Sequence, residues 1–305
     1  MRMRTVILAP VLALALALPS AAVAAADEKY PGGLDVVGLT LDQQLVSFSE
    51  KAPSSPRSLG QIRGLEKDSK LVGIDYRVQN GKLYGVGDRG GIYTISRSAK
   101  ATKVSQLTVA LEGKYFGVDF NPAANRLRVI SDTGQNLRHN IDDPAAPRVT
   151  TVDGRLTNPA IPPATTPTPA LGVTGAAYTN NDLNPATATT LFDIDTVNDR
   201  VSLQSPANAG TLAPTGSLGV NAGPNAGFDI YYTPKTGTNQ GFAALKVSGT
   251  YRFYRINILN GTASPVGTFP TGQQVFDIAL PLNQDYTGPR GGMNTGGGAT
   301  ATVAK

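Results

Sequence analysis

The chain has 305 residues, of which 40% are hydrophobic and 16% charged, and it carries a formal net charge of +5. It contains no Cys, which excludes disulfides, thiolate metal sites and lipid attachment through a Cys. The small excess of basic residues forms no stripe of Lys and Arg, so we predict no nucleic-acid partner.

The first 26 residues have the order of parts that is typical of a secretory signal peptide. Arg2 and Arg4 precede an apolar run from Val6 to Leu18, and small residues follow at positions 22–26. The apolar run is shorter than the about 20 residues of a membrane-spanning helix, and no second such run follows. We therefore expect a secreted, extracellular protein without a membrane span.

A short motif, Gly-apolar-Asp-apolar, recurs along the rest of the chain. Its copies are LVGIDYR (71–77), YFGVDFN (115–121), VTGAAYT (173–179), NAGFDIY (225–231) and QVFDIAL (274–280). Ala177 replaces the Asp of the third copy, and Val275 replaces the Gly of the fifth. The Asp positions are 44, 58, 52 and 48 residues apart. These spacings are close to one blade of a β-propeller, about 40–50 residues.

Short strand-like runs and turn residues follow the first four copies, which predicts an all-β propeller over residues 34–282. We count five blades, or six if residues 154–232 contain an extra one. The first strands, 34–49, lack a copy of the motif, and the last copy has no strands after it. We therefore predict that Phe276–Leu280 pairs beside Val36–Leu39, so that both ends build one blade and close the ring.

Two segments do not follow the repeat. Residues 156–172 are rich in Pro and Thr, which predicts an extended excursion between the third and fourth blades. Residues 286–305 form a Gly-rich tail that we expect to be disordered.

The phrases LVGIDYR, FGVDFNPAANRLRVISDTGQNLRHNID and VTGAAYTNND resemble the bacterial family of domains of unknown function numbered 4394. The likeness covers roughly residues 35 to 282 and includes three separated motifs in the same order. The resemblance implies an exported, propeller-like protein. It implies no activity, since the family has none assigned.

Asp75, Asp119, Asp229 and Asp277 occupy equivalent positions on strands that should line the central channel. In one interpretation each Asp accepts hydrogen bonds from backbone N–H groups of a neighbouring strand, once per blade. In the other, some of them hold a cation in the channel, and Asp oxygens suit Ca²⁺ or Mg²⁺, of which we name Ca²⁺ as the candidate. We favour the structural interpretation, because a fold needs the same residue in every blade whereas a ligand site seldom does.

Amides and charged groups gather at two predicted loop ends, SDTGQNLRHN (131–140) and YTNND (178–182). The candidate ligand-binding residues there are Asp132, Gln135, Asn136, Arg138, Asn180 and Asn181. The same residue types also close tight turns through their side chains, which is the main alternative.

Other motifs give little indication of catalysis. GVGDRG (85–90) matches a dinucleotide fingerprint, but a strand-like run follows where that motif requires a helix. His139 is the single histidine, and no sequence motif marks a nucleophile for it. The pair Asp193 and Asp195 is expected to face outward from a strand rather than to form a catalytic pair.

The leading hypothesis is a secreted, non-catalytic binding or scaffold protein, acting as a monomer. Its ligand, a glycan, a peptide or a cell-surface component, would lie at the loop end of the channel. The alternative is a metal-dependent hydrolase or lactonase with a cation held by the repeated Asp residues. The fold by itself does not choose between them.

Overall fold

The computed structural model describes residues 33–284. The predicted signal peptide, residues 1–26, and the Gly-rich tail, residues 286–305, lie outside this range. Within it, no helix is long and apolar enough to cross a membrane.

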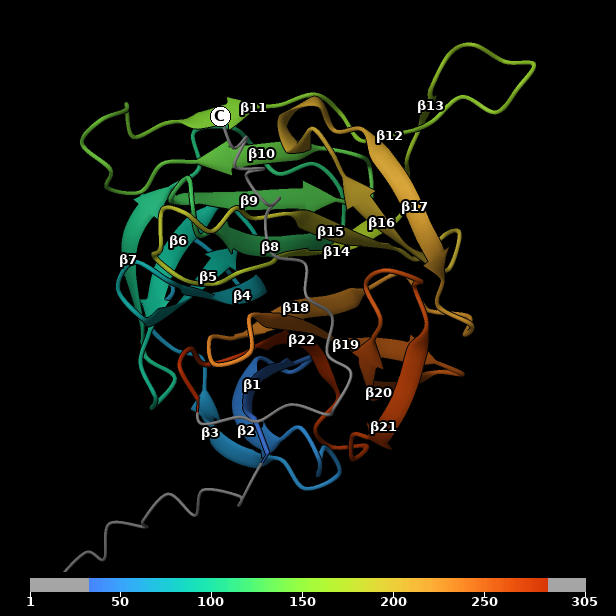
Figure 1. Cartoon of the computed structure of the whole chain (residues 1–305). Helices are drawn as coiled ribbons and strands as arrows, with labels where there is room; N and C mark the ends of the chain where they lie inside the picture. Colours follow the sequence, from blue (N-terminus) through green and yellow to red (C-terminus); the bar gives the residue numbers. More distant parts are fainter. Residues whose placement is uncertain (1–32, 285–305) are drawn as a thin grey trace, which may run out of the picture.

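Five four-stranded antiparallel sheets stand in a ring, so the fold is a five-bladed β-propeller (Figure 1). Blade 1 contains β22 (Val275–Ala279), β1 (Asp35–Thr40), β2 (Gln44–Ser49) and β3 (Arg57–Gln61). Blade 2 contains β4 (Leu71–Arg77), β5 (Lys82–Gly87), β6 (Gly91–Ile95) and β7 (Ala101–Gln106). Blade 3 contains β8 (Phe116–Asn121), β9 (Arg126–Ser131), β10 (Asn136–His139) and β11 (Thr150–Val152).

The last two blades follow without an additional sheet of blade size. Blade 4 contains β14 (Val173–Tyr178), β15 (Leu191–Asp195), β16 (Arg200–Gln204) and β17 (Leu212–Ser217). Blade 5 contains β18 (Ala226–Thr233), β19 (Thr238–Val247), β20 (Thr250–Ile256) and β21 (Ala263–Thr268). The prediction of five blades is confirmed, and the alternative of six is wrong.

The ring closes through the two ends of the propeller sequence, as predicted. Strand β1 pairs with β22 in antiparallel register, with Val37 opposite Ala279 and Gly38 opposite Ile278. Blade 1 therefore takes its innermost strand from the C-terminal part of the chain and its other three from the N-terminal part. This pairing leaves no open seam between the first and the last blade.

The strands that carry the repeated motif, β22, β4, β8, β14 and β18, are the inner strands, and each contacts the next around the ring. Their glycines lie where neighbouring blades approach most closely. A Cβ on Gly117 would lie 2.8 Å from the backbone nitrogen of Ala176, and one on Gly227 would lie 2.5 Å from the Cα of Asp277. Any larger residue would push the blades apart.

The Pro- and Thr-rich segment, 156–172, contains the short strands β12 (Thr157–Asn158) and β13 (Thr168–Pro169), which pair with each other. The loop between them extends away from the ring (Figure 1). In blade 4, a short 3-10 helix, η1 (Ala207–Ala209), follows β16.

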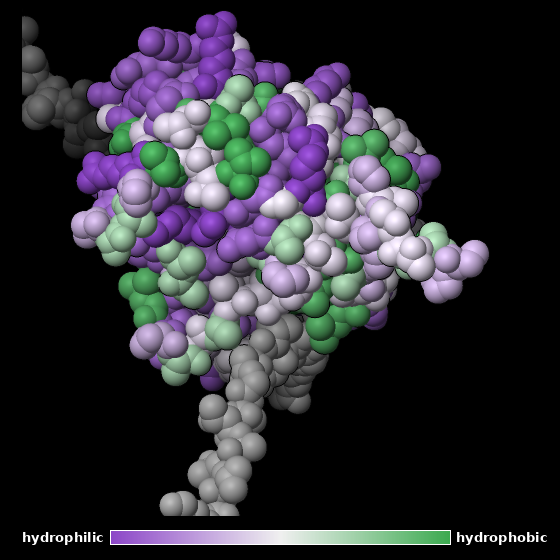
Figure 2. All heavy atoms as spheres, turned by 90° about the horizontal axis from the view of Figure 1, so that it is seen from above, coloured by the Kyte–Doolittle hydropathy of each residue, from purple (hydrophilic) through white to green (hydrophobic). Residues whose placement is uncertain are grey.

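The outer surface is mixed in polarity. On the face seen from above in Figure 1, apolar residues form separated patches among hydrophilic ones (Figure 2). The apolar core instead lies between the blades, in clusters that join residues of neighbouring sheets.

Candidate functional site

The repeated Asp residues link neighbouring blades. Each accepts a hydrogen bond from a backbone N–H of the next blade around the ring. The four donor–acceptor pairs are Ile74 to Asp277 (2.7 Å), Phe120 to Asp75 (2.8 Å), Tyr178 to Asp119 (3.1 Å) and Leu280 to Asp229 (2.6 Å). These are the bonds expected of a structural fastener, and they cover four of the five junctions between blades.

The fifth junction, between blades 4 and 5, is the one where Ala177 takes the place of Asp. Asparagine side chains link the blades there instead. Asn239 of β19 accepts a hydrogen bond from the backbone N–H of Asn180 (2.8 Å) and donates one to the side-chain oxygen of Asn180 (2.6 Å). Asn181 donates to the backbone carbonyl of Ile230 in β18 (3.1 Å). Amide pairs thus replace the missing carboxylate.

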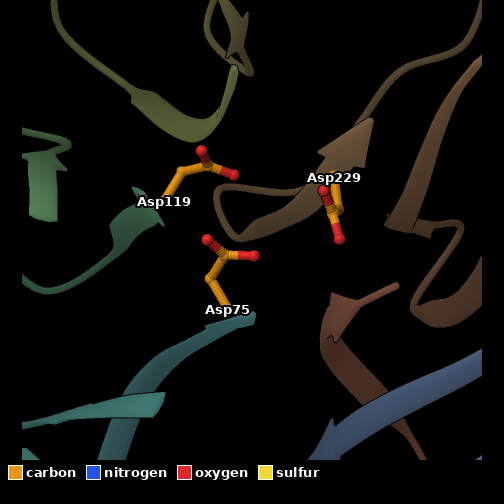
Figure 3. A group of neighbouring side chains, drawn as sticks. All are labelled: Asp75, Asp119 and Asp229. Atoms are coloured by element: carbon orange, nitrogen blue, oxygen red, sulfur yellow. The ribbon is translucent and has the colours of Figure 1, made fainter. Parts of the chain in front are cut away.

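Three of the channel carboxylates also converge on one another. Asp75, Asp119 and Asp229 each contribute one carboxylate oxygen, and these three oxygens lie within 4.8 Å of one another. Figure 3 shows the three side chains pointing toward a common space from three different blades. All three are buried, while Asp277 does not join this group. Oxygens at these separations can bind one Ca²⁺, whose ligand distances are about 2.3–2.6 Å.

Burial and mutual repulsion make these carboxylates costly to ionise. Burial raises the pKa of Asp75 well above its ordinary value, and the nearby Asp229 charge adds to the shift. Burial also raises the pKa of Asp119, with a further contribution from Asp75. The pKa of Asp229 rises to about 6, again through burial. A cation or a bound proton would each relieve this cost.

The six candidate ligand residues do not form one cluster. Asp132 follows β9 at the end of the ring where the inner strands begin, and it accepts hydrogen bonds from the backbone of Lys114 and Tyr115. Asn180 and Asn181 follow the far end of the inner strand β14. The length of a six-residue strand, roughly 20 Å at about 3.3 Å per residue, separates the two groups.

The remaining three candidates have structural partners as well. Gln135 is buried and bonds to the backbone of Ala110 and Glu112. Asn136 is buried against Arg128, whose guanidinium donates to its side-chain oxygen (2.7 Å). Arg138 donates to Asp153 (2.9 Å). A ligand-binding role for the six residues stays a prediction.

The pair Asp193 and Asp195 corrects a sequence expectation. Both side chains are fully buried on β15, so the prediction that they face outward is wrong. Asp195 accepts hydrogen bonds from Arg200 and Asn198, whereas neither carboxylate oxygen of Asp193 has a hydrogen-bond partner among the described residues. Burial raises the pKa of Asp193 well above its ordinary value. Sequence alternation could not show that a neighbouring blade covers this face.

His139 lies beside Ser105, a neighbour that the sequence did not indicate. The Nε2 atom of His139 lies 2.8 Å from the Ser105 hydroxyl of blade 2, and its Nδ1 atom lies 3.0 Å from the Thr150 hydroxyl. Burial lowers the pKa of His139, which favours the neutral ring. Thr150 occupies the place of the carboxylate that orients the histidine in a Ser-His-Asp triad. The contact therefore links blades 2 and 3 without a complete triad.

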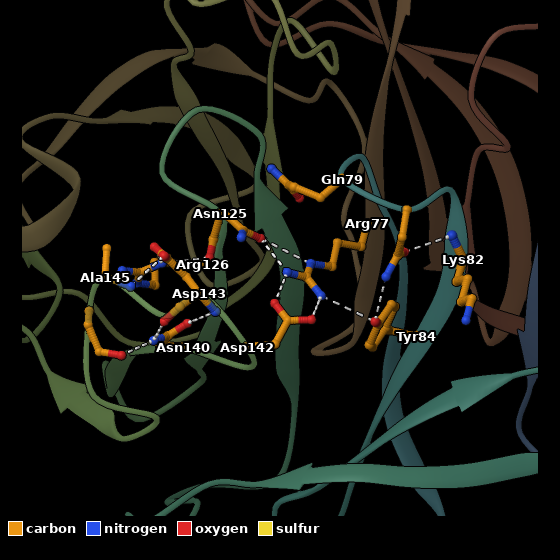
Figure 4. Close-up of polar contacts among 12 residues, drawn as sticks. Arg77, Gln79, Lys82, Tyr84, Asn125, Arg126, Asn140, Asp142, Asp143 and Ala145 are labelled. Carbon is orange, nitrogen blue, oxygen red and sulfur yellow. Dashed lines mark hydrogen bonds and ion pairs between the residues drawn. The ribbon is translucent and has the colours of Figure 1, made fainter.

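A second polar link joins these two blades (Figure 4). Arg77, at the end of β4, donates to Asp142 and Asn125 of blade 3 and to Tyr84 of its own blade. Its guanidinium also lies 5.8 Å from the centre of the Tyr84 ring. Because its bonds to Asp142 and Asn125 cross between the two blades, we assign Arg77 to the interface of blades 2 and 3.

Sequence reasoning missed a groove of about 970 Å³ between blades 1 and 2, which we call the blade 1–2 groove. It lies at the end of the ring where the inner strands finish, since Tyr76 near the end of β4 and Pro281 after β22 both line it. Its basic lining residues are Arg57, Lys82, Arg97 and Lys100. They are spread over 44 residues of sequence, so only the packing of two blades reveals them as a group.

Comparison with known families gives one clear match. The family model described as "Domain of unknown function (DUF4394)" matches residues 44–279. No curated protein matches the chain.

Solved structures show only distant likeness. An auxiliary nutrient binding protein from Bacteroides ovatus is 13% identical with a TM-score of 0.40, and the match covers 68% of this chain and 55% of that one. This chain therefore spans about half the length of that protein. A protein of unknown function from Bacteroides thetaiotaomicron is 12% identical with a TM-score of 0.42, covering 83% and 68%. A Lactobacillus plantarum protein is 16% identical with a TM-score of 0.40, covering 84% and 69%.

Proposed function

The chain belongs to the DUF4394 family of domains of unknown function, and from its own geometry we propose that it is a non-catalytic ligand-binding protein whose ligand occupies the blade 1–2 groove. The observation that carries this proposal is the groove itself, with a volume of about 970 Å³. Small-molecule sites are concave, range over about 300–1,000 Å³, and combine an apolar lining with a few polar groups.

The residues that line the groove support binding rather than chemistry. Asp35 is the single acidic residue among them, and the lining contains no histidine. Glycosidic hydrolysis by a carboxylate pair needs two acids, and a serine nucleophile needs an adjacent base. The groove has hydroxyl groups, such as those of Ser47 and Tyr76, that suit hydrogen bonding to a ligand.

A matched pair of tryptophan substitutions on β7 tests whether the groove binds a ligand. Thr102 lines the groove, and Val104 is an exposed residue two positions along the same strand that does not line it. Glycan arrays, peptide arrays and a panel of small amphiphiles should give at least one binder at micromolar concentration. Thr102→Trp should weaken that binding at least tenfold, while Val104→Trp should leave it unchanged. Equal binding by both variants, or no binder in any of the three collections, would overturn the proposal.

A second candidate is a cation in the channel, because oxygens of Asp75, Asp119 and Asp229 lie within 4.8 Å of one another. Ca²⁺ suits such an all-oxygen site, and a bound cation could activate water for a hydrolase or lactonase reaction. Elemental analysis and thermal melts with EDTA, and then with added Ca²⁺, test this candidate. An unchanged melting temperature and no bound metal would exclude it.

We also propose export of the protein and action as a monomer outside the cell. The basic and apolar start of the chain supports export. Sequencing the N-terminus of protein recovered from the culture medium should find a start just after residue 26. Light scattering should give the mass of one chain.

A further inference from the structure

The rim of the blade 1–2 groove is strongly basic. Arg57 of β3, Lys82 at the start of β5, and Arg97 and Lys100 between β6 and β7 all line the groove and are exposed. Asp35 is the one acidic residue in the lining, so the formal charge of the lining side chains is +3. A cleft lined by one sign of charge attracts ligands of the opposite sign.

The floor of the groove is apolar and comes from both blades. Val37 and Leu45 of blade 1 and Leu83 and Ile95 of blade 2 are buried side chains that line it. Leu59 lies half-buried beside them. This floor favours an apolar group, because removing apolar surface from water is favourable.

Tyr76 is half-buried in the same groove and lines it together with Arg97 and Asp35. Burial raises the pKa of its phenol to about 12, with the Arg97 charge acting in the opposite direction. The phenol therefore stays neutral at physiological pH. It can donate a hydrogen bond to an anionic group held by the basic residues.

We infer that the ligand of the blade 1–2 groove is a free, single-chain amphiphile with an anionic head group, its head at the basic rim and its chain on the apolar floor. This inference rests on the proposed binding function and adds the ligand class to it. The complementarity of charge at the rim and of apolar surface at the floor selects this class over neutral glycans, which have no charge for the rim and little apolar surface for the floor.

Calorimetry with decanoate and decyltrimethylammonium below their critical micelle concentrations, and with decanol below its solubility limit, separates the contributions of head and chain. Decanoate should bind at least tenfold more tightly than the other two, and acetate, which lacks the chain, should not bind measurably. Equal binding of decanol and decanoate would overturn the inference. So would attachment to phosphatidylglycerol vesicles without binding of free decanoate.

A charge-matched pair of double variants locates the head group. Lys82→Gln with Lys100→Gln removes two basic groups from the rim, and Lys67→Gln with Lys70→Gln removes two exposed ones that do not line the groove. The rim variant should weaken decanoate binding by roughly twofold to fivefold per lysine, the range for exposed ion pairs. The control should retain the affinity of the unmodified protein. Equal affinities in both variants would overturn the assignment of the head group.

The two levels of the proposal fail in different ways. If a neutral ligand binds and Thr102→Trp blocks it, the groove is a binding site and the anionic ligand class is wrong. If Thr102→Trp changes the binding of none of the array ligands and none of the amphiphiles, the proposed binding function of the groove is wrong as well.

Discussion

The carboxylate of Asp119 accepts a hydrogen bond from the backbone N–H of Tyr178, which lies 59 residues later in the next blade, at 3.1 Å. Both side chains are buried. The bond joins two inner strands edge to edge beside the channel, and equivalent bonds join three other pairs of blades. The stability of the ring therefore depends on carboxylate acceptors that point from four of the five inner strands to the next blade.

Removing the side-chain oxygen of Asp119 that accepts this hydrogen bond should destabilise the protein more than removing only the charge of Asp119. Asp119→Ala leaves the Tyr178 N–H buried without a partner, which costs about 1–3 kcal/mol. Asp119→Asn keeps an oxygen that can accept the same bond. Urea denaturation at pH 7 should therefore show a clearly lower midpoint for the Ala variant than for the Asn variant. Equal midpoints would show that the hydrogen bond contributes little.

The channel carboxylates should make the protein less stable as the pH rises. Their pKa values are raised in the folded state. Their contribution to the free energy of unfolding is therefore fully present below their pKa in the unfolded chain, about 3.9. It is lost as the pH rises through their pKa in the folded protein, which for Asp229 is about 6.

Asp119→Asn removes one of these titrations and should flatten the dependence of unfolding free energy on pH between pH 4 and 8. The quantity to measure is the difference between the unmodified protein and this variant at each pH. A difference that stays constant over that range would contradict the raised pKa.

His139 should act in the opposite direction. Burial lowers its pKa, so the unfolded chain binds the proton more readily than the folded one. Its contribution to the free energy of unfolding is present above the pKa of the unfolded chain, about 6.5. It is lost as the pH falls from there toward the lower pKa of the folded protein. Comparing the urea midpoints of the unmodified protein and His139→Gln from pH 7.5 to 5 isolates this effect. The difference between the two should shrink as the pH falls, and a growing difference would contradict the prediction.

Deletion of the closing strand should abolish cooperative unfolding. A chain without residues 274–305 lacks β22, so β1 loses its partner and the inner ring loses one of its five strands. A chain without residues 286–305 keeps β22 and should melt like the intact protein. Calorimetry of both deletion variants measures how cooperative their thermal unfolding is. A sharp unfolding transition in the chain without residues 274–305 would mean that the ring does not need the pairing of β1 with β22.

The repeat made the architecture predictable. Because Gly and Asp return at blade spacing, the inner strands and the joined ends could be placed from the sequence, and the structure confirms both. The candidate ligand residues were harder to place. Asn180 and Asp132 looked alike as polar residues near turns. Asn180 links blades 4 and 5, whereas Asp132 binds the segment before β8 at the opposite end of the ring.

The sequence by itself determined the fold, because one blade cannot bury its faces alone and a repeated strand pattern has few ways of doing so other than closing into a ring. Only the tertiary structure decided where the groove lies that we propose as the binding site. Lys82 and Arg57 belong to different blades, and no periodicity relates them. Both line the same groove because the faces of blades 1 and 2 leave a space between them, and the shape of that space depends on side-chain packing across the whole junction.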